Sequence, residues 1–427
     1  MTERARFSTA STSAWVLYDL ANTVYAATVT FLFTPHARQV LGDRIGSVGT
    51  TNLVSMAIAA LLVPIAGAIA DRTGRAHLYL TAVTLACIAA MLGMALDWGP
   101  GWLLLCFAVA NITYNLGLLY YNALLPAVAS PERTGLVSGI GVGVGYLGTI
   151  LVLATLLPRP ELGSSRFAIA ALMFLVVAAP CMLLVRAPRA AKQPAAAPVR
   201  QALAGLRDTL RTLPQHRNLL WFLVGNFCLV DVLNTAVLYF ADFTRGTFRR
   251  AAEAGELQLF GHHFDGAAGM DSFVIVAGLL LNLAALACGL LSGRFTDRHP
   301  LGVMRGSAVA LLVALVGGSW FAGASALGYL TTLVLCGALG LAGIWTAGRK
   351  VLLLLAPPEH VGEYFGLYGI TVKLSVVGAF TFAQVDDALG PRAAMLVQAI
   401  PLLIGLACLC IVRVPKAAIA AASSPAR

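Results

Sequence analysis

Two copies of the pattern Asp-x-x-Asn-Thr stand inside stretches that are apolar enough to be buried in lipid. The copies begin at Asp19 and Asp231 and place Asn22 and Asn234 one helical turn further on, on the same face. A carboxylate at the centre of a membrane helix costs about 2.5–3.5 kcal/mol on insertion scales, so it is rarely kept without a use. Such a group can exchange a proton or bind a substrate ammonium. The alternative is an interhelical hydrogen bond or a buried ion pair.

Lys373 is the only basic residue that the sequence places within a predicted membrane span, away from its ends. It needs a carboxylate or water as partner, and Asp19 and Asp231 are the nearest candidates in kind. Two acidic groups and one basic group around a cavity predict binding of a zwitterion, such as an amino acid. The same three groups can instead form a salt-bridge switch that never touches substrate.

Further polar candidates lie on the fourth and first predicted spans. Asn111, Asn115 and Asn122 fall on one stripe of the fourth span, and Tyr18 precedes Asp19. Because amides in hydrocarbon need partners, this stripe should face protein or a cavity. Interhelical hydrogen bonding and solute binding both fit the pattern.

A second set of charged residues follows the second and eighth spans. The pattern Gly67-x-x-x-Asp71-Arg72 recurs as Gly293-x-x-x-Asp297-Arg298. Asp71 is placed to meet the positive N-terminus of a helix in the other half of the chain. Such contacts would hold one face shut and break when it opens; the alternative is a tight turn with ordinary flanking charges. The candidate gate residues are Gly67, Asp71, Arg72, Arg75, Glu132, Arg133, Gly293, Asp297, Arg298 and Glu359.

The elements that position these residues are membrane helices. The chain has 427 residues, of which 59% are hydrophobic and 11% charged, whereas soluble domains have about 45–50% apolar and about 25% charged residues. This composition predicts an all-α polytopic membrane protein. Apolar runs of about 20 residues predict twelve transmembrane helices, at 14–34, 50–70, 77–96, 101–125, 136–157, 167–185, 218–240, 272–294, 306–323, 326–347, 364–385 and 392–412.

The distribution of Lys and Arg predicts that both termini are cytoplasmic. With the termini inside, 20 of the 29 Lys and Arg residues fall in inner segments, Arg349 and Lys350 among them, and 8 in outer segments. We expect the protein to lie in the plasma (inner) membrane, with both terminal tails on the cytoplasmic side. The predicted units are a tail (1–13), a six-helix bundle (14–185), a linker (186–217), a second six-helix bundle (218–412) and a tail (413–427).

Three landmarks recur in the same order in the two halves. Asp19 and Asp231 are 212 residues apart, Asp71 and Asp297 are 226 apart, and the Pro-Glu pairs that end at Glu132 and Glu359 are 227 apart. This is the parallel repeat expected of two bundles related by an axis along the membrane normal. Gly139 and Gly143 in the fifth span predict close helix packing or flexibility for rocking.

Several of these segments carry a family resemblance. Residues 67–75 resemble the loop signature of the major facilitator superfamily, Gly-x-x-x-Asp-Arg-x-Gly-Arg. Residues 15–22, 121–126, 143–148 and 357–368 are similar to the vacuole-effluxer-like family (autophagy-related vacuolar amino-acid effluxers) of that superfamily. The resemblance implies two pseudo-symmetric six-helix bundles with spans one and seven lining a central cavity. It also implies alternating access and small-solute transport, with amino-acid efflux in the fungal relatives.

The sequence therefore predicts a secondary active transporter of a small solute that is coupled to protons and works as a monomer among membrane lipids. The runner-up is a transporter-like receptor or scaffold without transport. We expect no enzyme activity, cofactor, metal or nucleic-acid partner, because no phosphate-binding loop, metal-ligand spacing or nucleophile motif occurs.

Overall fold

The computed structural model describes residues 8–41, 46–187, 207, 211, 213–357, 360–374 and 377–414. Most of the predicted linker and C-terminal tail therefore lies outside the described residues, as do residues 1–7 of the N-terminal tail. Within the described residues, 12 helices are long and apolar enough to cross a membrane. This confirms the predicted all-α polytopic fold.

The first half of the chain contributes six of these spans. Its elements are α1 (Thr9–Ala27) with the π-helical turn η2 (Thr28–Phe33) and α2 (Thr34–Leu41), α3 (Gly46–Thr73), α4 (Ala76–Met94), α5 (Pro100–Ala123), α6 (Leu125–Val128), the 3-10 turn η4 (Pro131–Arg133), α7 (Thr134–Thr155), η5 (Pro160–Leu162) and α8 (Ser165–Leu184).

The second half contributes the other six. Its elements are η6 (Leu213–Gln215), α10 (Arg217–Leu238), α11 (Phe240–Glu253), a hairpin of β1 (Gln258–Leu259) and β2 (His262–His263), α12 (Gly266–Arg298), α13 (Pro300–Phe321), α14 (Ala326–Thr332) with η7 (Leu333–Gly337) and α15 (Ala338–Leu355), α16 (Val361–Leu374), α17 (Val377–Leu389), α18 (Pro391–Val397) and α19 (Ala399–Ile411).

One boundary changes the interpretation of two cations. The tenth span runs from Ala326 to Leu355, whereas the sequence predicts its end at residue 347. Arg349 and Lys350 are therefore not cytoplasmic loop residues, as predicted, but buried residues of α15, 6% and 2% exposed. Arg349 pairs with the buried carboxylate of Asp19 and Lys350 with the half-buried carboxylate of Asp297, and such pairing is how charged residues are retained inside a membrane helix. The prediction that Lys373 is the only basic residue inside a span is wrong for the same reason.

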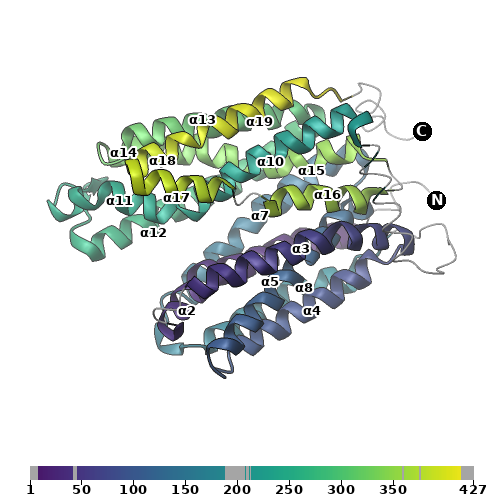
Figure 1. Cartoon of the computed structure of the whole chain (residues 1–427), viewed down its shortest axis with the longest axis horizontal. Coiled ribbons are helices and arrows are strands. Elements are labelled where there is room, and N and C mark those ends of the chain that lie inside the picture. Colours follow the sequence, from purple (N-terminus) through teal and green to yellow (C-terminus); the bar gives the residue numbers. More distant parts are fainter. Residues whose placement is uncertain are drawn as a thin grey trace.

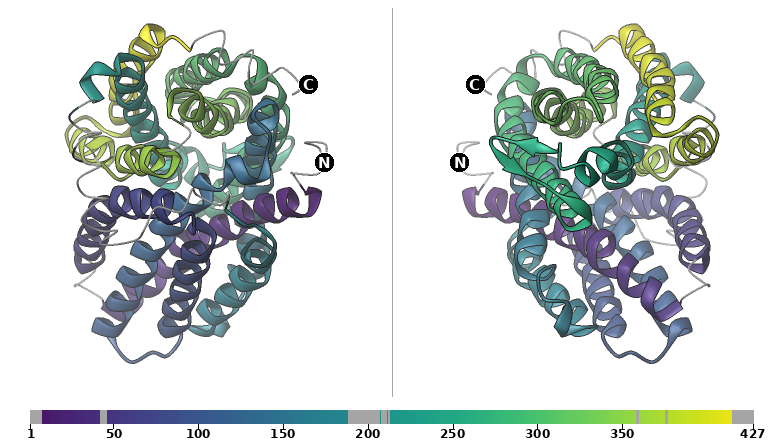
Figure 2. Two further views of the ribbon diagram at one scale, coloured as in Figure 1. Left: turned by 90° about the vertical axis from the view of Figure 1, so that its right-hand side faces the viewer. Right: turned by 90° about the vertical axis from the view of Figure 1, so that its left-hand side faces the viewer.

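The helices of the two halves form two groups that lie against each other (Figure 1). In the end-on views the first half lies below and the second half above (Figure 2). We call the end at which α3 and α12 finish and α7 and α16 begin the latch end. The two groups meet there and diverge toward the other end (Figure 1).

Glycines allow the two groups to approach closely near the latch end. A Cβ atom on Gly139 of α7 would lie 2.5 Å from the carbonyl oxygen of Gly289 and 2.6 Å from the Cα of Gly293, both on α12. A Cβ atom on Gly366 of α16 would lie 2.6 Å from the Cα of Pro64 on α3. Since these neighbours are backbone atoms, neither crossing has room for a side chain. The close packing that the sequence predicts around Gly139 is present.

Candidate substrate cavity and latches

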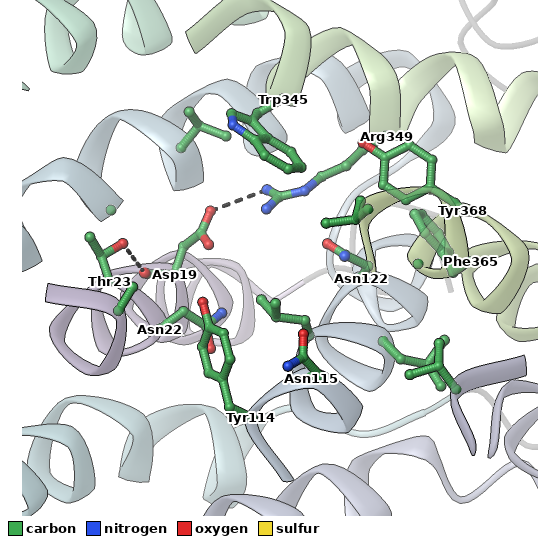
Figure 3. A pocket seen from close by; sticks show the side chains of 18 of the residues that line it. Asp19, Asn22, Thr23, Tyr114, Asn115, Asn122, Trp345, Arg349, Phe365 and Tyr368 are labelled. Carbon is green, nitrogen blue, oxygen red and sulfur yellow. Dashed lines mark hydrogen bonds and ion pairs between the residues drawn. The ribbon is translucent and has the colours of Figure 1, made fainter. Parts of the chain in front are cut away.

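A cavity of about 240 Å³ lies between the two halves. Four helices of the first half (α1, α3, α5 and α7) and two of the second (α15 and α16) contribute to its wall. Figure 3 shows its polar side chains facing a common space. Its polar and aromatic lining residues are Asp19, Asn22, Thr23, Tyr114, Asn115, Asn122, Tyr146, Trp345, Arg349, Phe365 and Tyr368.

An ion pair between the halves dominates this cavity. Nη1 of Arg349 on α15 donates to Oδ2 of Asp19 on α1 at 3.1 Å (Figure 3). The two residues are only 6% and 8% exposed. Separating buried charges would leave each without compensation, so this pair resists dissociation far more than a surface ion pair does.

Aromatic rings of the first half hold the guanidinium from another side. The Arg349 Cζ atom lies 5.3 Å from the ring centre of Tyr121 and 5.7 Å from that of Trp15. Those two rings stack at 4.3 Å, and the Trp15 indole N–H donates to the Tyr121 carbonyl oxygen. A residue of the second half is thus inserted into a site built by the first, with charge and cation–π attraction acting together.

The predicted polar residues divide into two groups. Asn22, Asn115 and Asn122 line the cavity, and the Asn22 amide nitrogen is buried without a hydrogen-bond partner in the described structure. Asn111, in contrast, donates to Asn52 and Ser55 of α3 and acts between helices.

Tyr18 also makes an interhelical contact. Its hydroxyl lies 2.5 Å from the hydroxyl of Thr84 on α4, and neither residue lines the cavity. Tyr18, like Asn111, therefore forms a hydrogen bond between helices and does not line the cavity.

The second Asp-x-x-Asn copy has different surroundings from the first. Asp231 is 3% exposed, and its carboxylate accepts the backbone N–H of Gly378 at the start of α17. Asp231 and Asn234 do not line the cavity. The side chain of Lys373 lies outside the described part of the structure.

The first latch joins α3 to α16. The carboxylate oxygens of Asp71 accept the backbone N–H groups of Gly362 and Glu363, each at 2.8 Å. These are the second and third residues of α16, whose N–H groups have no partner within the helix. Asp71 thus meets the positive end of a helix of the other half, as the sequence predicts.

The second latch repeats this arrangement between α12 and α7. Asp297 accepts the N–H groups of Gly135 and Leu136 at 2.7 and 2.9 Å, again the second and third residues of a helix. Gly362 follows Gly135 by 227 residues (362 − 135), the offset of the repeated landmarks. The two latches are therefore equivalent positions of the internal repeat.

The second latch also contains a buried cation. Nζ of Lys350 lies 3.3 Å from Oδ1 of Asp297 and donates to the backbone carbonyl oxygen of Pro131. In the first latch, the described contacts of Asp71 include no Lys or Arg; Glu363 pairs there with His360 at 3.3 Å.

The remaining predicted gate residues lie around these contacts. Arg75, Arg133 and Arg298 are exposed, whereas Arg72 and Glu132 are half-buried. Glu359 lies outside the described residues. Gly67 packs against the backbone of Gly362, and Gly293 against that of Gly135 and Leu136.

One feature of the sequence indicates that Arg349 and Lys350 lie within the tenth span. The run Val351–Leu355 that follows Arg349 and Lys350 is wholly apolar, so the span can continue past the basic pair. Hydropathy nonetheless favours ending a span at two adjacent charges, because the Asp partners lie far away in the sequence.

The comparisons with known proteins agree with this architecture. The profile of the Major Facilitator Superfamily matches residues 16–377. This chain belongs to the major facilitator superfamily. Members of the superfamily are transporters rather than enzymes, bind small-molecule substrates and often work as monomers.

One relative of this chain is the uncharacterized MFS-type transporter YxiO of Bacillus subtilis (strain 168). It is 26% identical over 405 residues, which cover 88% of this chain and 89% of that protein.

Two solved major facilitator structures share the fold. The human organic anion transporter MFSD10 (TETRAN) has a TM-score of 0.69 at 16% identity, covering 94% of this chain and 99% of its own. FucP in the outward conformation has a TM-score of 0.70 at 12% identity, covering 94% and 97%.

Proposed function

We propose that this major facilitator transporter is a secondary active transporter that moves a small zwitterionic solute, such as an amino acid, by proton-coupled alternating access. The observation that carries the proposal is the Asp19–Arg349 pair, which offers both charges in a buried cavity between the two halves. The similarity of residues 357–368 to the vacuole-effluxer-like family supports an amino acid as solute. We do not favour a receptor or scaffold without transport, because the cavity retains charged and amide side chains, among them Asp19, Arg349 and Asn22.

The latches suggest how access alternates. Asp71 and Asp297 hold the latch end shut by accepting N–H groups from helices of the opposite half. Opening this end requires both sets of hydrogen bonds to break as the halves rock. The excess of Lys and Arg in the segments at this end supports a cytoplasmic orientation for it. In that orientation the structure is the state closed to the cytoplasm.

The cavity chemistry fits a small dipolar solute. The fork-shaped guanidinium of Arg349 can bind a carboxylate through two hydrogen bonds, and the carboxylate of Asp19 can accept from an ammonium group. At about 240 Å³ the cavity is smaller than the 300–1,000 Å³ of typical drug-binding pockets. A zwitterion would replace the internal ion pair without leaving either charge unpaired.

Two cations are candidates for the solute carboxylate, and a binding panel separates them. If Arg349 binds the solute carboxylate, Arg349→Met should weaken binding of carboxylated solutes by about 100-fold. That change corresponds to about 2.7 kcal/mol, which is typical of a hydrogen bond to a charged group. In the same case, Lys373→Ala should leave the affinity near that of the native protein. The reverse pattern would assign the carboxylate to Lys373. Affinities measured by thermal shift across a solute panel report the outcome, and two unchanged variants would contradict a zwitterionic substrate.

Proton coupling predicts a second result. In proteoliposomes with an imposed pH gradient, Asp19→Asn should abolish gradient-driven uptake or efflux while exchange of solute down its own gradient continues. The reason is that an amide can neither take up nor release the coupled proton. Asp231→Asn provides the matched test of the other copy. If both variants keep full gradient dependence, neither Asp carries the proton and this part of the proposal fails.

A further inference from the structure

Two adjacent cations of α15 reach different places in the transporter. Arg349 enters the cavity and pairs with Asp19 of α1 at 3.1 Å. Lys350 enters the second latch, where it lies 3.3 Å from Asp297 and donates to the carbonyl oxygen of Pro131. Both are buried, so neither is an ordinary surface charge. The mechanism proposed above gives Arg349 a role but none to Lys350.

Helix geometry joins the two positions rigidly. Successive residues of an α-helix are separated by about 1.5 Å along the axis and about 100° around it. One short segment therefore presents one cation to the cavity and the next to the latch. The same segment is tied to α7 by a hydrogen bond from the Ser138 hydroxyl to the Thr346 carbonyl oxygen at 3.2 Å. Because α7 also provides the latch N–H groups of Gly135 and Leu136, the Ser138–Thr346 hydrogen bond connects α15 to the helix that carries that latch.

The arrangement occurs in only one half of the repeat. With the 227-residue offset, the positions equivalent to Arg349 and Lys350 are Asn122 (349 − 227) and Ala123 (350 − 227), which carry no charge. The first latch accordingly has two backbone N–H donors to Asp71 and no Lys or Arg among its described contacts. A link through cations of one helix can therefore act on the second latch without acting directly on the first.

We propose that Arg349 and Lys350 form a coupling element that connects occupancy of the cavity to the second latch, an inference that rests on the proposed transport function. Lys350 is a positioning residue in it. When solute or a proton releases Arg349 from Asp19, α15 shifts and Lys350 withdraws from Asp297 and Pro131. The second latch then opens before the first.

Hydrogen exchange of the latch amides tests this without any solute. The N–H groups of Gly135 and Leu136 report the second latch, and those of Gly362 and Glu363 report the first. In the full-length purified protein, Lys350→Met should raise exchange at the second latch about tenfold, in keeping with loss of a charged hydrogen-bond partner. Exchange at the first latch should stay within about twofold of native.

The decisive variants act at a distance from the measured amides. Asp19→Asn and Arg349→Met should each raise exchange at Gly135 and Leu136, although neither Asp19 nor Arg349 contacts them. The double variant Asp19→Asn/Arg349→Met leaves neither charge of the pair unpaired, so it serves if a single variant does not fold. Arg349→Lys, which keeps the charge, should restore part of the native protection. Tyr114→Phe is the matched control, because it alters the cavity wall on α5, which contributes no latch amide.

The outcomes separate this inference from the transport proposal. Native exchange at the second latch in both Asp19→Asn and Arg349→Met overturns the coupling, as does native exchange in Lys350→Met. An equal rise at both latches overturns it too, since that would be general loosening. Transport is measured independently in proteoliposomes. A protein that moves no solute but shows selective exchange would contradict only the proposed function.

Discussion

Replacing Arg349 by Met is expected to lower the free energy of unfolding by about 3–5 kcal/mol, because Asp19 would be left buried without its cation. Transport should fall below detection at the same time, since the cavity would lose its one described cationic wall residue. Thermal unfolding of the purified protein measures the first effect, and solute flux into proteoliposomes measures the second.

A double variant separates stability from function. In Asp19→Asn/Arg349→Met both charges of the pair are removed, so most of the lost stability should return, because no buried charge remains unpaired. Transport should not return, since neither charge is present for solute or proton. If the double variant is as unstable as Arg349→Met alone, the guanidinium acts mainly through its packing on Trp15 and Tyr121.

An exposed ion pair provides the matched control. Arg249 and Glu253 lie one turn apart on α11 at 3.6 Å, and their side chains are 74% and 63% exposed. Arg249→Met should change the free energy of unfolding by less than about 1 kcal/mol and leave transport unchanged, because surface pairs are screened by water. A loss as large as that of Arg349→Met would show that burial of the pair does not determine its contribution.

The sequence predicted most of what local patterns determine. Runs of apolar residues predicted all 12 spans of the described structure, because membrane thickness dictates their length. The position of Asp71 at a helix N-terminus of the other half was also predictable. The signature around it places a carboxylate at the end of a span, and a helix N-terminus is the strongest positive feature available there.

The partners across the cavity were not predictable. Asp19 and Arg349 are 330 residues apart, and no local pattern relates them. The repeat alone predicts similar surroundings for Asp19 and Asp231. Their surroundings differ since the residue equivalent to Arg349 in the first half is Asn122. Asp231 consequently has no matching arginine and accepts a backbone N–H from Gly378 instead.

The crossing of α7 and α12 should also be sensitive to substitution, because backbone atoms of the two helices are in contact there. Gly139→Leu would place a side chain where even a Cβ atom lies 2.5 Å from the carbonyl oxygen of Gly289 and 2.6 Å from the Cα of Gly293. Backbone atoms cannot turn aside as a side chain can, so the two helices must separate. Overpacking of this kind costs about 1–3 kcal/mol, which would shift the equilibrium away from the closed latch end by about 5- to 150-fold.

Two measurements would check this effect. Transport by Gly139→Leu should fall at least about fivefold, following the smaller shift in that equilibrium, and hydrogen exchange should rise at both latches, because the wedge separates the halves as a whole. This differs from the selective effect expected of Lys350→Met. Gly306→Leu on α13 is the matched control, since a Cβ there meets nothing within 4 Å. Native transport and exchange in Gly139→Leu would mean that closure of the latch end does not require this crossing.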